Sequence, residues 1–231
     1  MNIMDEEHNE HPYYGSHSLV NVLNMKGYSV GRKRIRRLMG LMNLEALCPK
    51  RNLSKAGRAK YIMPYLLRHK TTEHSNQVWS IDITYIRMNK GFMYQIGILD
   101  AYSRYVVGWK LTNSLDRSNV LEVLKQAVSR YGAPEIINSD QGAQFTCHEW
   151  IDTVKSLGIK VSMDGRGRCL DNHWIERFWR SLKTEYVYIC PQDRVEDLRE
   201  GIQRYIDYYN NERPHQGINN CRPRDWYEYA A

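Results

Sequence analysis

The sequence predicts an α/β fold in which a mixed β-sheet is flanked by helices and preceded by a small helical segment. Three consecutive stretches alternate apolar and polar residues, as half-buried strands do, and helical and strand patterns then alternate along the chain. Two short basic stretches near the N-terminus show helical periodicity instead. With 231 residues, the chain is long enough for one domain of ordinary size and a smaller one.

The small helical segment, residues 1–47, has the pattern of a helix-turn-helix unit. Apolar residues recur at helical spacing in residues 16–26 and 31–42, and the Gly-containing stretch GYSV separates them. The second helix directs its basic residues away from its apolar side, as a helix that enters a DNA groove does. Other basic helical hairpins share this pattern. The candidate DNA-contacting residues are Lys33, Arg36 and Arg37.

Positive charge is concentrated in one part of the chain. The formal net charge is +7, yet residues 26–70 hold thirteen Lys and Arg residues and only one acid, Glu45. Such an arm favours a polyanionic partner, most simply DNA, because neutralised phosphates release counterions. Residues 48–75 contain Pro, Gly and basic residues without periodicity, which predicts a basic linker. A merely solvated linker is the alternative interpretation.

Three strands follow the linker. Residues 77–88, QVWSIDITYIRM, place Ser80, Asp82 and Thr84 on one face and apolar residues on the other. The turn NKG leads to a second strand at FMYQIGILD, and AYSR leads to a third at YVVGWKLT. Strands joined by such short turns pair antiparallel.

Helices and short strands then alternate to the end of the chain. We expect a helix near 117–130, stopped by YGAP, then a strand at EIIN, a helix near 146–157 and a strand at IKVS. The glycine-containing loop MDGRGRC precedes a helix that begins near residue 169, and a last helix covers about 194–210. Helices inserted between strands in this way cover both faces of a mixed sheet.

Several classes of protein are not expected. The chain has no apolar run of about 18 residues that would span a membrane, and its polar, acidic start does not resemble a secretory signal. Five scattered cysteines without a C-x-x-C pair predict reduced thiols and argue against a zinc site. We therefore expect a cytoplasmic protein with no membrane partner.

The stretch CLDNHWIERFWRSLKTE, residues 169–185, combines an apolar stripe with a free face. At about 100° per residue, the stripe consists of Leu170, Trp174, Ile175, Phe178, Leu182 and Tyr186. The free face carries Asn172, Glu176, Arg180 and Lys183. The ordinary interpretation is a solvated face on which Glu176 pairs with Arg180, worth about 0.2 to 0.5 kcal/mol.

Three acids occupy positions that suggest a shared site. Asp82 stands inside a strand, where Asp is uncommon, and Asp140 follows the end of the strand EIIN, where ligand sites gather. Glu176 stands on the free helix face. Three carboxylates at one point need a cation, and oxygen ligands suit Mg²⁺ or Mn²⁺. Singly, each has an ordinary explanation: a solvated strand residue, a turn former or a surface ion pair.

The spacing of these acids resembles a known family. Asp82, Asp140 and Glu176, with 35 residues between the last two, are similar to the D,D-35-E triad of the retroviral-integrase superfamily. The motifs HPYYGS, NQVWSIDITYI, ILDAYSRYVVGW, SDQGAQFT, SMDGRGRCLDN, ERFWRSLKTE and YYNNERPHQG resemble, in order and spacing, the insertion-sequence transposases of the IS-three type. The similarity runs from residue 11 to residue 226 and is closest to the second-frame catalytic product.

The resemblance implies an RNase H-like catalytic core, which we expect at residues 76–190, with residues 191–231 as a C-terminal helix and tail packed on it. It implies two Mg²⁺ or Mn²⁺ ions held by Asp82, Asp140 and Glu176. The implied activity is cutting at the terminal inverted repeats of a DNA element, followed by attack of the freed 3′ hydroxyl on a second phosphodiester. A basic residue seven places after the glutamate binds DNA in such enzymes, and Lys183 matches it.

Further contacts with double-stranded DNA, both element ends and target, are predicted around this core. Arg180 and Asn172 share the helix face of Glu176, close enough to hold phosphates. Arg166 and Arg168, beside two glycines, could close over a phosphate, although a solvated loop is an equal alternative. For Arg213 and His215 in the closing motif, packing on the core is preferred to DNA contact.

Partners and alternatives complete the predictions. Family enzymes carry a recognition and leucine-zipper region ahead of HPYYGS, and no heptad run occurs here, so the upstream-frame product is a candidate partner. A homo-oligomer is expected when the enzyme is active, in a bacterial cytoplasm and associated with the nucleoid. A non-catalytic DNA-binding regulator of transposition and a general RNase H-like nuclease stay open as alternatives.

Overall fold

The structure is a computed structural model that describes residues 2–47, 61–68, 70–88, 91–165 and 172–229. Its contacts divide the chain into two compact units, Met1–Lys55 and Ala56–Ala231. No helix in these described ranges is long and apolar enough to cross a bilayer. The two units are taken separately below.

The first unit is a bundle of three helices, α1 (Asn2–Glu10), α2 (Ser16–Met25) and α3 (Arg32–Leu41). Met4, Leu19, Leu23 and Ile35 form its buried core. The predicted helices are confirmed as α2 and α3. Helix α1 was not predicted, because only its Met4 and Glu7 are buried and the stretch shows little apolar periodicity.

Between α2 and α3 the chain turns at a glycine, as the sequence indicated. Gly27 has a φ of +88°, in the left-handed region that favours glycine. The amide of the following Tyr28 donates to the carbonyl of Leu23 at 2.9 Å, which closes the end of α2. The predicted candidates on α3 are exposed: Lys33, Arg36 and Arg37.

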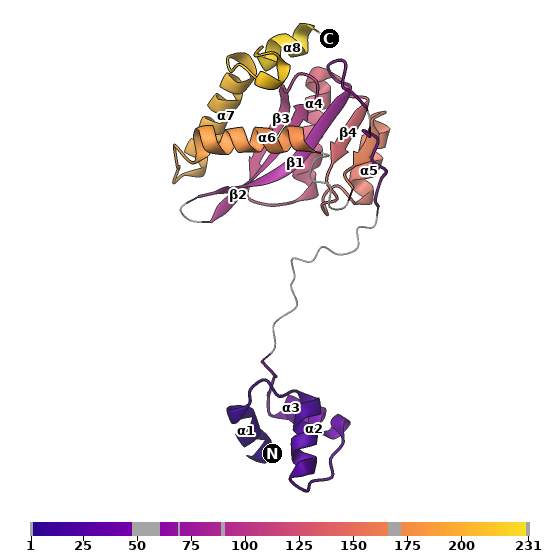
Figure 1. The fold of residues 1–231 in the computed structure, drawn as a ribbon, viewed down its shortest axis with the longest axis vertical. Coiled ribbons are helices and arrows are strands. Elements are labelled where there is room, and N and C mark those ends of the chain that lie inside the picture. The colour runs from indigo at the N-terminus through magenta and orange to yellow at the C-terminus, as the bar shows by residue number, and fades with distance from the viewer. Residues whose placement is uncertain (1, 48–60, 69, 89–90, 166–171, 230–231) are drawn as a thin grey trace. The chain divides into compact units, whose positions relative to one another are not determined.

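The second unit contains a five-stranded sheet in the order β3-β2-β1-β4-β5 (Figure 1). Its strands are β1 (Val78–Arg87), β2 (Phe92–Asp100), β3 (Val106–Thr112), β4 (Ile136–Ser139) and β5 (Lys160–Met163). The first three pair antiparallel, and β4 pairs parallel to β1 and to β5. The predicted mixed sheet is confirmed, including its antiparallel start.

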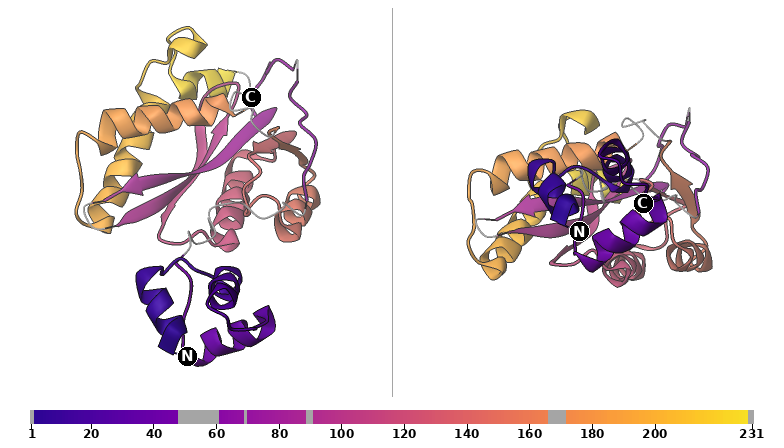
Figure 2. Two further views of the ribbon diagram at one scale, coloured as in Figure 1. Left: turned by 60° about the horizontal axis from the view of Figure 1, so that its bottom comes forward. Right: turned by 90° about the horizontal axis from the view of Figure 1, so that it is seen from below.

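Helices cover both faces of this sheet (Figure 2). One face packs against α4 (Arg117–Tyr131) and α5 (His148–Ser156) through a core that includes Trp79, Ile81 and Trp150. The other packs against α6 (His173–Leu182) and α7 (Val195–Asn211) through Phe178, Leu182 and Tyr209 among others. A π-helical turn, Lys183–Val187, continues α6. The chain ends with a short 3₁₀ turn, Gln216–Ile218, and α8 (Pro223–Tyr229).

The segment before β1 is better ordered than a linker predicts. Residues 48–60 lie outside the described residues, but residues 61–68 run along the second unit. Leu67 is buried beside Val78 and Ile136, and the amide of Leu66 donates to Ser162 Oγ at 3.0 Å. The sequence hid this packing because isolated apolar residues in an extended chain carry no period.

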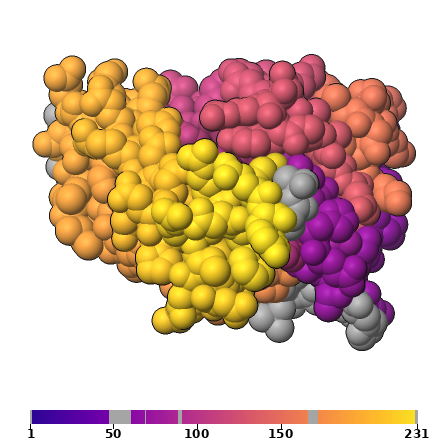
Figure 3. Space-filling view, turned by 90° about the horizontal axis from the view of Figure 1, so that it is seen from above, coloured from indigo at the N-terminus to yellow at the C-terminus, as the bar shows by residue number. Residues whose placement is uncertain are grey.

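The last helix, α8, also packs on this unit and was not predicted. Tyr227 is buried in the core on the α4 side, and its carbonyl accepts a hydrogen bond from Ser75 Oγ at 2.8 Å. The space-filling view accordingly shows the C-terminal residues (yellow) beside α4 (rose) and the segment before β1 (purple) (Figure 3). Residues 191–229 therefore contribute two packed helices to the unit.

Candidate active site

The pairing of β1 with β4 brings the two predicted aspartates to the same place. Ser80 of β1 is the register partner of Asn138 in the parallel strand β4. Asp82 and Asp140 each lie two residues further along the chain, so they stand at the same level of the sheet. Asp82 is half-buried in the middle of β1, whereas Asp140 is exposed just after β4 ends.

Glu176 joins them from α6. The helix lies across β1 and β2 (Figures 1 and 2). It covers the face of Asp82, since Trp179 of α6 donates to that carboxylate, and Glu176 is exposed on it. No ion pair joins Glu176 to Arg180 in the structure as described, although both residues are in it. The ordinary interpretation of Glu176 as one half of a surface pair is therefore not supported.

The electrostatics link all three acids. Burial raises the pKa of Asp82 from 3.8 to about 6, and the charges of Asp140 and Glu176 raise it as well. Hydrogen bonds from the Ile83 amide and from Trp179 oppose this rise. Asp82 is thus a carboxyl group whose ionised form is destabilised by its surroundings and by two neighbouring carboxylates.

A tryptophan that the sequence analysis did not single out orients Asp82. Trp179 Nε1 donates to Asp82 Oδ2 at 3.0 Å. Its ring lies on Gly97, the register partner of Asp82 in β2, where a Cβ would approach Trp179 Cη2 to 2.5 Å. Only glycine admits the ring there. The glycine in the middle of YQIGILD was the available signal for this close approach.

Asp140 is held by a local turn. The amide of Gly142 donates to Asp140 Oδ1 at 2.9 Å, the arrangement of an Asx turn. A Cβ on Gly142 would also stand 2.9 Å from that oxygen, so a side chain there would push the carboxylate aside. Asp164, which follows β5, also ties that strand end to β4, since its Oδ1 accepts from Asn138 Nδ2 at 2.7 Å.

Lys183 lies beside β1, the strand of Asp82. Its Nζ donates to Thr84 Oγ1 at 2.7 Å, and Thr84 follows Asp82 on the same face of β1. Partial burial lowers the pKa of Lys183, and the charge of Asp82 opposes that effect. The structure thus brings the Lys183 side chain and the three acids to one face of the sheet.

Other predicted residues are placed differently. Arg180 is exposed one turn after Glu176. Asn172 is only 3% exposed, so it does not share the free face of Glu176. The correction arises because α6 begins at His173 and Asn172 has non-helical backbone angles. Arg166, Arg168 and Leu170 lie outside the described residues.

The buried arc of α6 is also wider than predicted. Ile175, Phe178 and Leu182 are buried as expected, but Trp179 is buried with them, and Trp174 and Tyr186 are half-buried. The helix packs on β2 through Trp179 and on α7 through Phe178, whose ring centroid is 4.9 Å from that of Tyr209. Two partners bury more of a helix than the single stripe assumed.

Within the described residues, no group of three or more His, Cys, Asp or Glu side chains forms a cluster that could hold a metal ion. The chemistry of the three acids nevertheless fits a hard divalent cation, because they offer oxygen donors only. A cation would also relieve the mutual destabilisation seen at Asp82.

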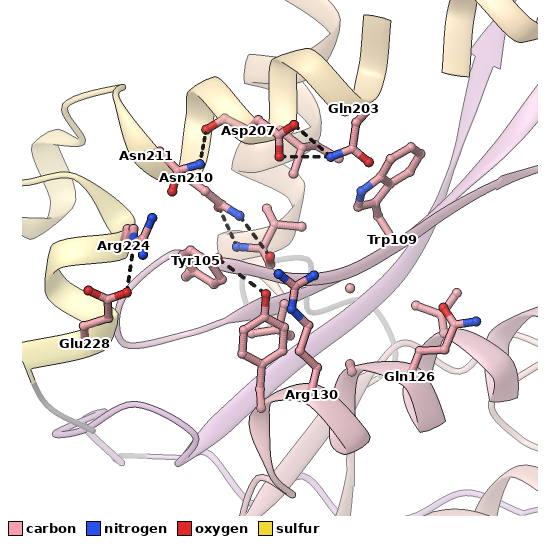
Figure 4. Close-up of a pocket in the computed structure, with 17 residues that line it drawn as sticks. Tyr105, Trp109, Gln126, Arg130, Gln203, Asp207, Asn210, Asn211, Arg224 and Glu228 are labelled. Atoms are coloured by element: carbon pink, nitrogen blue, oxygen red, sulfur yellow. Dashed lines mark hydrogen bonds and ion pairs between the residues drawn. The ribbon is translucent and has the colours of Figure 1, made fainter. Parts of the chain in front are cut away.

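A separate hollow lies at the β3 edge of the sheet (Figure 4). It has a volume of about 550 Å³ and is bordered by Trp109 of β3, by Gln126 and Arg130 of α4, and by Gln203 and Asp207 of α7. None of the three acids lines it. The hollow is therefore distinct from the candidate site.

Comparison with protein families gives matches over most of the chain. Residues 72–169 and 157–223 match two models described as integrase core domains, and residues 1–52 match an HTH-like domain. A transposase for insertion sequence element IS904 of Lactococcus lactis is 30% identical over 94% of this chain and 88% of its own length. The putative transposase InsK for IS150 of Escherichia coli is 30% identical over 89% and 74%, respectively. The transposase InsF for IS3A, also of Escherichia coli, is 27% identical over 92% and 76%.

Solved structures share the fold. The catalytic core domain of HTLV-2 integrase, solved in complex with magnesium, aligns with a TM-score of 0.56 at 20% identity, over 68% of this chain and 99% of its own. A simian T-cell lymphotropic virus intasome structure aligns with a TM-score of 0.59 at 16% identity, over 92% of this chain and 74% of its own. The predicted RNase H-like fold of the integrase cores is thereby confirmed.

Proposed function

Since the chain belongs to the transposases of bacterial insertion sequences, which are DDE polynucleotidyl transferases of the integrase superfamily, we propose that it cuts DNA at the terminal inverted repeats of its element and transfers the cut strand. In the first step water attacks a phosphodiester and the P–O3′ bond breaks, which leaves a 3′ hydroxyl and a 5′ phosphate. In the second step that hydroxyl oxygen attacks the phosphorus of another phosphodiester, whose own 3′ oxygen departs and takes up a proton.

One observation carries this proposal: the charges of both Asp140 and Glu176 raise the pKa of Asp82. The three acids also have the same order and spacing as the family triad. Asp82, Asp140 and Glu176 would hold two Mg²⁺ or Mn²⁺ ions. When bound, such a pair supplies positive charge that stabilises the attacking and departing oxygens of phosphoryl transfer. Trp179 keeps one Asp82 oxygen oriented, and the Gly142 amide does the same for Asp140.

Two basic residues support the handling of DNA phosphates beside the acids. Lys183 stands over Thr84, the next residue on the Asp82 face of β1, and carries a positive charge there. Arg180 is exposed one turn after Glu176. Contacts of this kind position the DNA without reading its sequence. Contact by Arg166 and Arg168 remains a prediction.

The first unit would add DNA binding of its own. Lys33, Arg36 and Arg37 are exposed on α3, the second helix of the predicted helix-turn-helix. In this proposal residues 1–47 bind DNA, and residues 48–75 connect them to the catalytic core. Residues 76–190 form that core and carry out cutting and strand transfer, and residues 191–231 pack on it. The partners are element ends and target DNA, a second copy of the chain in the active complex, and the upstream-frame product. The place of action is the bacterial nucleoid.

Asp140→Asn gives the direct test. The amide keeps an oxygen that can accept from Gly142, so the turn survives while one negative charge is lost. With Mn²⁺ and a duplex carrying the element's end sequence, we expect cutting to fall by at least about 100-fold while DNA affinity changes less than about twofold. Asp197→Asn, an exposed acid in the first turn of α7, is the matched control and should cut normally.

Three outcomes separate the alternatives. Retained cutting by Asp140→Asn would contradict the proposed chemistry. A parent chain that binds DNA but never nicks an end would favour the non-catalytic regulator. Equal degradation of unrelated duplexes would favour a general nuclease.

A further inference from the structure

Two of the sequence motifs, ILDAYSRYVVGW and YYNNERPHQG, are not used by the three acids, yet the structure brings them together against α6. Arg104 of the first motif has a φ of +66° in the turn between β2 and β3, and its amide donates to the Asp100 carbonyl at 2.9 Å. This backbone directs its guanidinium over Trp174 of α6, 5.5 Å from the ring centroid. Among the residues that the structure describes, buried Arg104 Nη1 has no hydrogen-bond partner.

The second motif covers Arg104 from the other side. His215 Nδ1 accepts from the Gly217 amide at 3.1 Å and so closes a tight turn. A Cβ on Gly217 would lie 3.2 Å from His215 Cε1 and 3.9 Å from Arg104 Nε. Glycine at this position thus avoids a tight contact with the His215 ring, and the turn lies in van der Waals range of the guanidinium.

Three arginines, Arg104, Arg177 and Arg213, gather around His215. Neither Arg104 nor Arg177, the α6 residue next to Glu176, forms an ion pair within the described part of the chain. Arg213 is neutralised by Glu185, at 2.6 Å. The nearby Asp100 already accepts from the Asn76 and Ser103 amides and from Ser103 Oγ.

The same three arginines act on the pKa of His215. Burial lowers the pKa of His215 to about 4, and Arg104, Arg213 and Arg177 lower it further in that order. Burial and the charge of Arg177 likewise lower the pKa of Arg104. The imidazole is therefore neutral at physiological pH, and the local charge is that of the guanidinium groups.

We propose that Arg104 and Arg177 form a second phosphate-binding site, which holds a DNA backbone phosphate next to the one at the three acids. The inference rests on the proposed function, since it assigns the anion to the same DNA substrate. Guanidinium groups pair well with phosphate oxygens, and partial burial strengthens that attraction. Arg177 follows Glu176 directly in α6, so both residues belong to the same turn of that helix.

This assignment gives the two motifs a role. Trp174 and the His215–Gly217 turn hold Arg104 in place, so they are positioning residues for the phosphate site. Arg213, paired with Glu185 beside Tyr205, fixes the closing motif to the end of α6. Sequence-independent contacts of this kind set the register of the DNA on the enzyme.

The test measures DNA binding in the full chain carrying Asp140→Asn, so that no cutting interferes. Fluorescence anisotropy of a labelled duplex is followed over a range of salt for the parent, Arg177→Gln, Arg104→Lys and Arg104→Gln. Arg177 is exposed, so its replacement leaves the fold intact. Arg199 is an exposed arginine on α7 that forms no ion pair with another described residue, so Arg199→Gln removes the same charge elsewhere and is the matched control.

For Arg177→Gln we expect the slope of log affinity against log salt to fall by about 1, and affinity to fall several-fold at about 0.1 M salt, equally for end and unrelated duplexes. Arg104→Lys should lose less than Arg104→Gln, because it keeps the charge. The control should match the parent. Unchanged slopes for both Arg177→Gln and Arg104→Gln would overturn this inference alone, whereas a parent that binds no DNA would overturn the proposed function with it.

Discussion

Asp82→Asn should make the metal-free protein more stable while removing its activity. Asp82 is half-buried beside two other carboxylates, and its pKa rises from 3.8 to about 6. Since one pH unit corresponds to about 1.36 kcal/mol, ionised Asp82 destabilises the fold by up to about 3 kcal/mol. Asparagine removes the charge and keeps an oxygen that can accept from Trp179 Nε1.

The dependence on pH follows from the direction of the shift. Below about pH 4, Asp82 is protonated in both the folded and the unfolded chain, so parent and variant should be equally stable. Between about pH 4 and 6 the folded parent holds a proton that the unfolded chain has lost, and its stability falls relative to the variant. Above about pH 6 the full difference of about 3 kcal/mol is present.

Urea unfolding in the presence of EDTA, followed by tryptophan fluorescence, measures this difference. All six tryptophans lie between residues 79 and 226, so the signal reports the catalytic unit alone. We expect the midpoint of Asp82→Asn to rise by about 1 M at pH 7.5 and to equal the parent at pH 4. Asp197→Asn should instead lose a few tenths of a kcal/mol, because it removes a charge from a helix N-terminus. An Asp82→Asn variant no more stable than the parent at pH 7.5 would refute the reasoning.

Two further predictions concern the support of Asp82. Trp179→Phe removes the donor to Asp82 Oδ2, so the pKa of Asp82 should rise further. The acid limb of the pH profile of cutting should then move to higher pH. An unchanged profile would show that this hydrogen bond does not affect Asp82. Gly97→Ala places a Cβ 2.5 Å from Trp179 Cη2, so urea unfolding should show a loss of about 1 to 3 kcal/mol, against a loss below about 0.5 kcal/mol if the ring moves freely aside.

Much of the fold could be predicted because its elements carry strong local patterns. The alternation in QVWSIDITYIRM fixed both the strand and the face of Asp82, and β1 follows it. The helix over residues 195–211 repeats Leu198, Ile202, Tyr205 and Tyr209 at helical spacing, and all four are buried. Such segments bury one regular face, so period alone reveals them.

The sequence was less informative where burial depends on several partners at once. Helix α6 packs on both the sheet and α7, so Trp179 is buried although it lies outside the predicted stripe. Asn172 is buried because the helix starts after it. The segment before β1 is held by single contacts such as Leu67, which have no period to detect.

The candidate site, too, could be predicted only in part from the sequence. The positions of Asp82, Asp140 and Glu176 could be proposed from residue type, order and spacing. The support from Trp179 and Gly97 could not, since it depends on which residue of β2 pairs with Asp82. The cluster at Arg104 was hidden too, because it joins a turn, a helix and the closing motif from three distant parts of the chain.

The central claim is that three carboxylates act together on divalent ions, and a Mn²⁺ titration followed by electron paramagnetic resonance tests it without any assay of activity. Free Mn²⁺ should fall in the presence of the parent chain, and Asp82→Asn, Asp140→Asn and Glu176→Gln should each weaken binding by at least about tenfold, while Asp197→Asn binds like the parent. Parent-like Mn²⁺ binding by all three carboxamide variants would contradict the account.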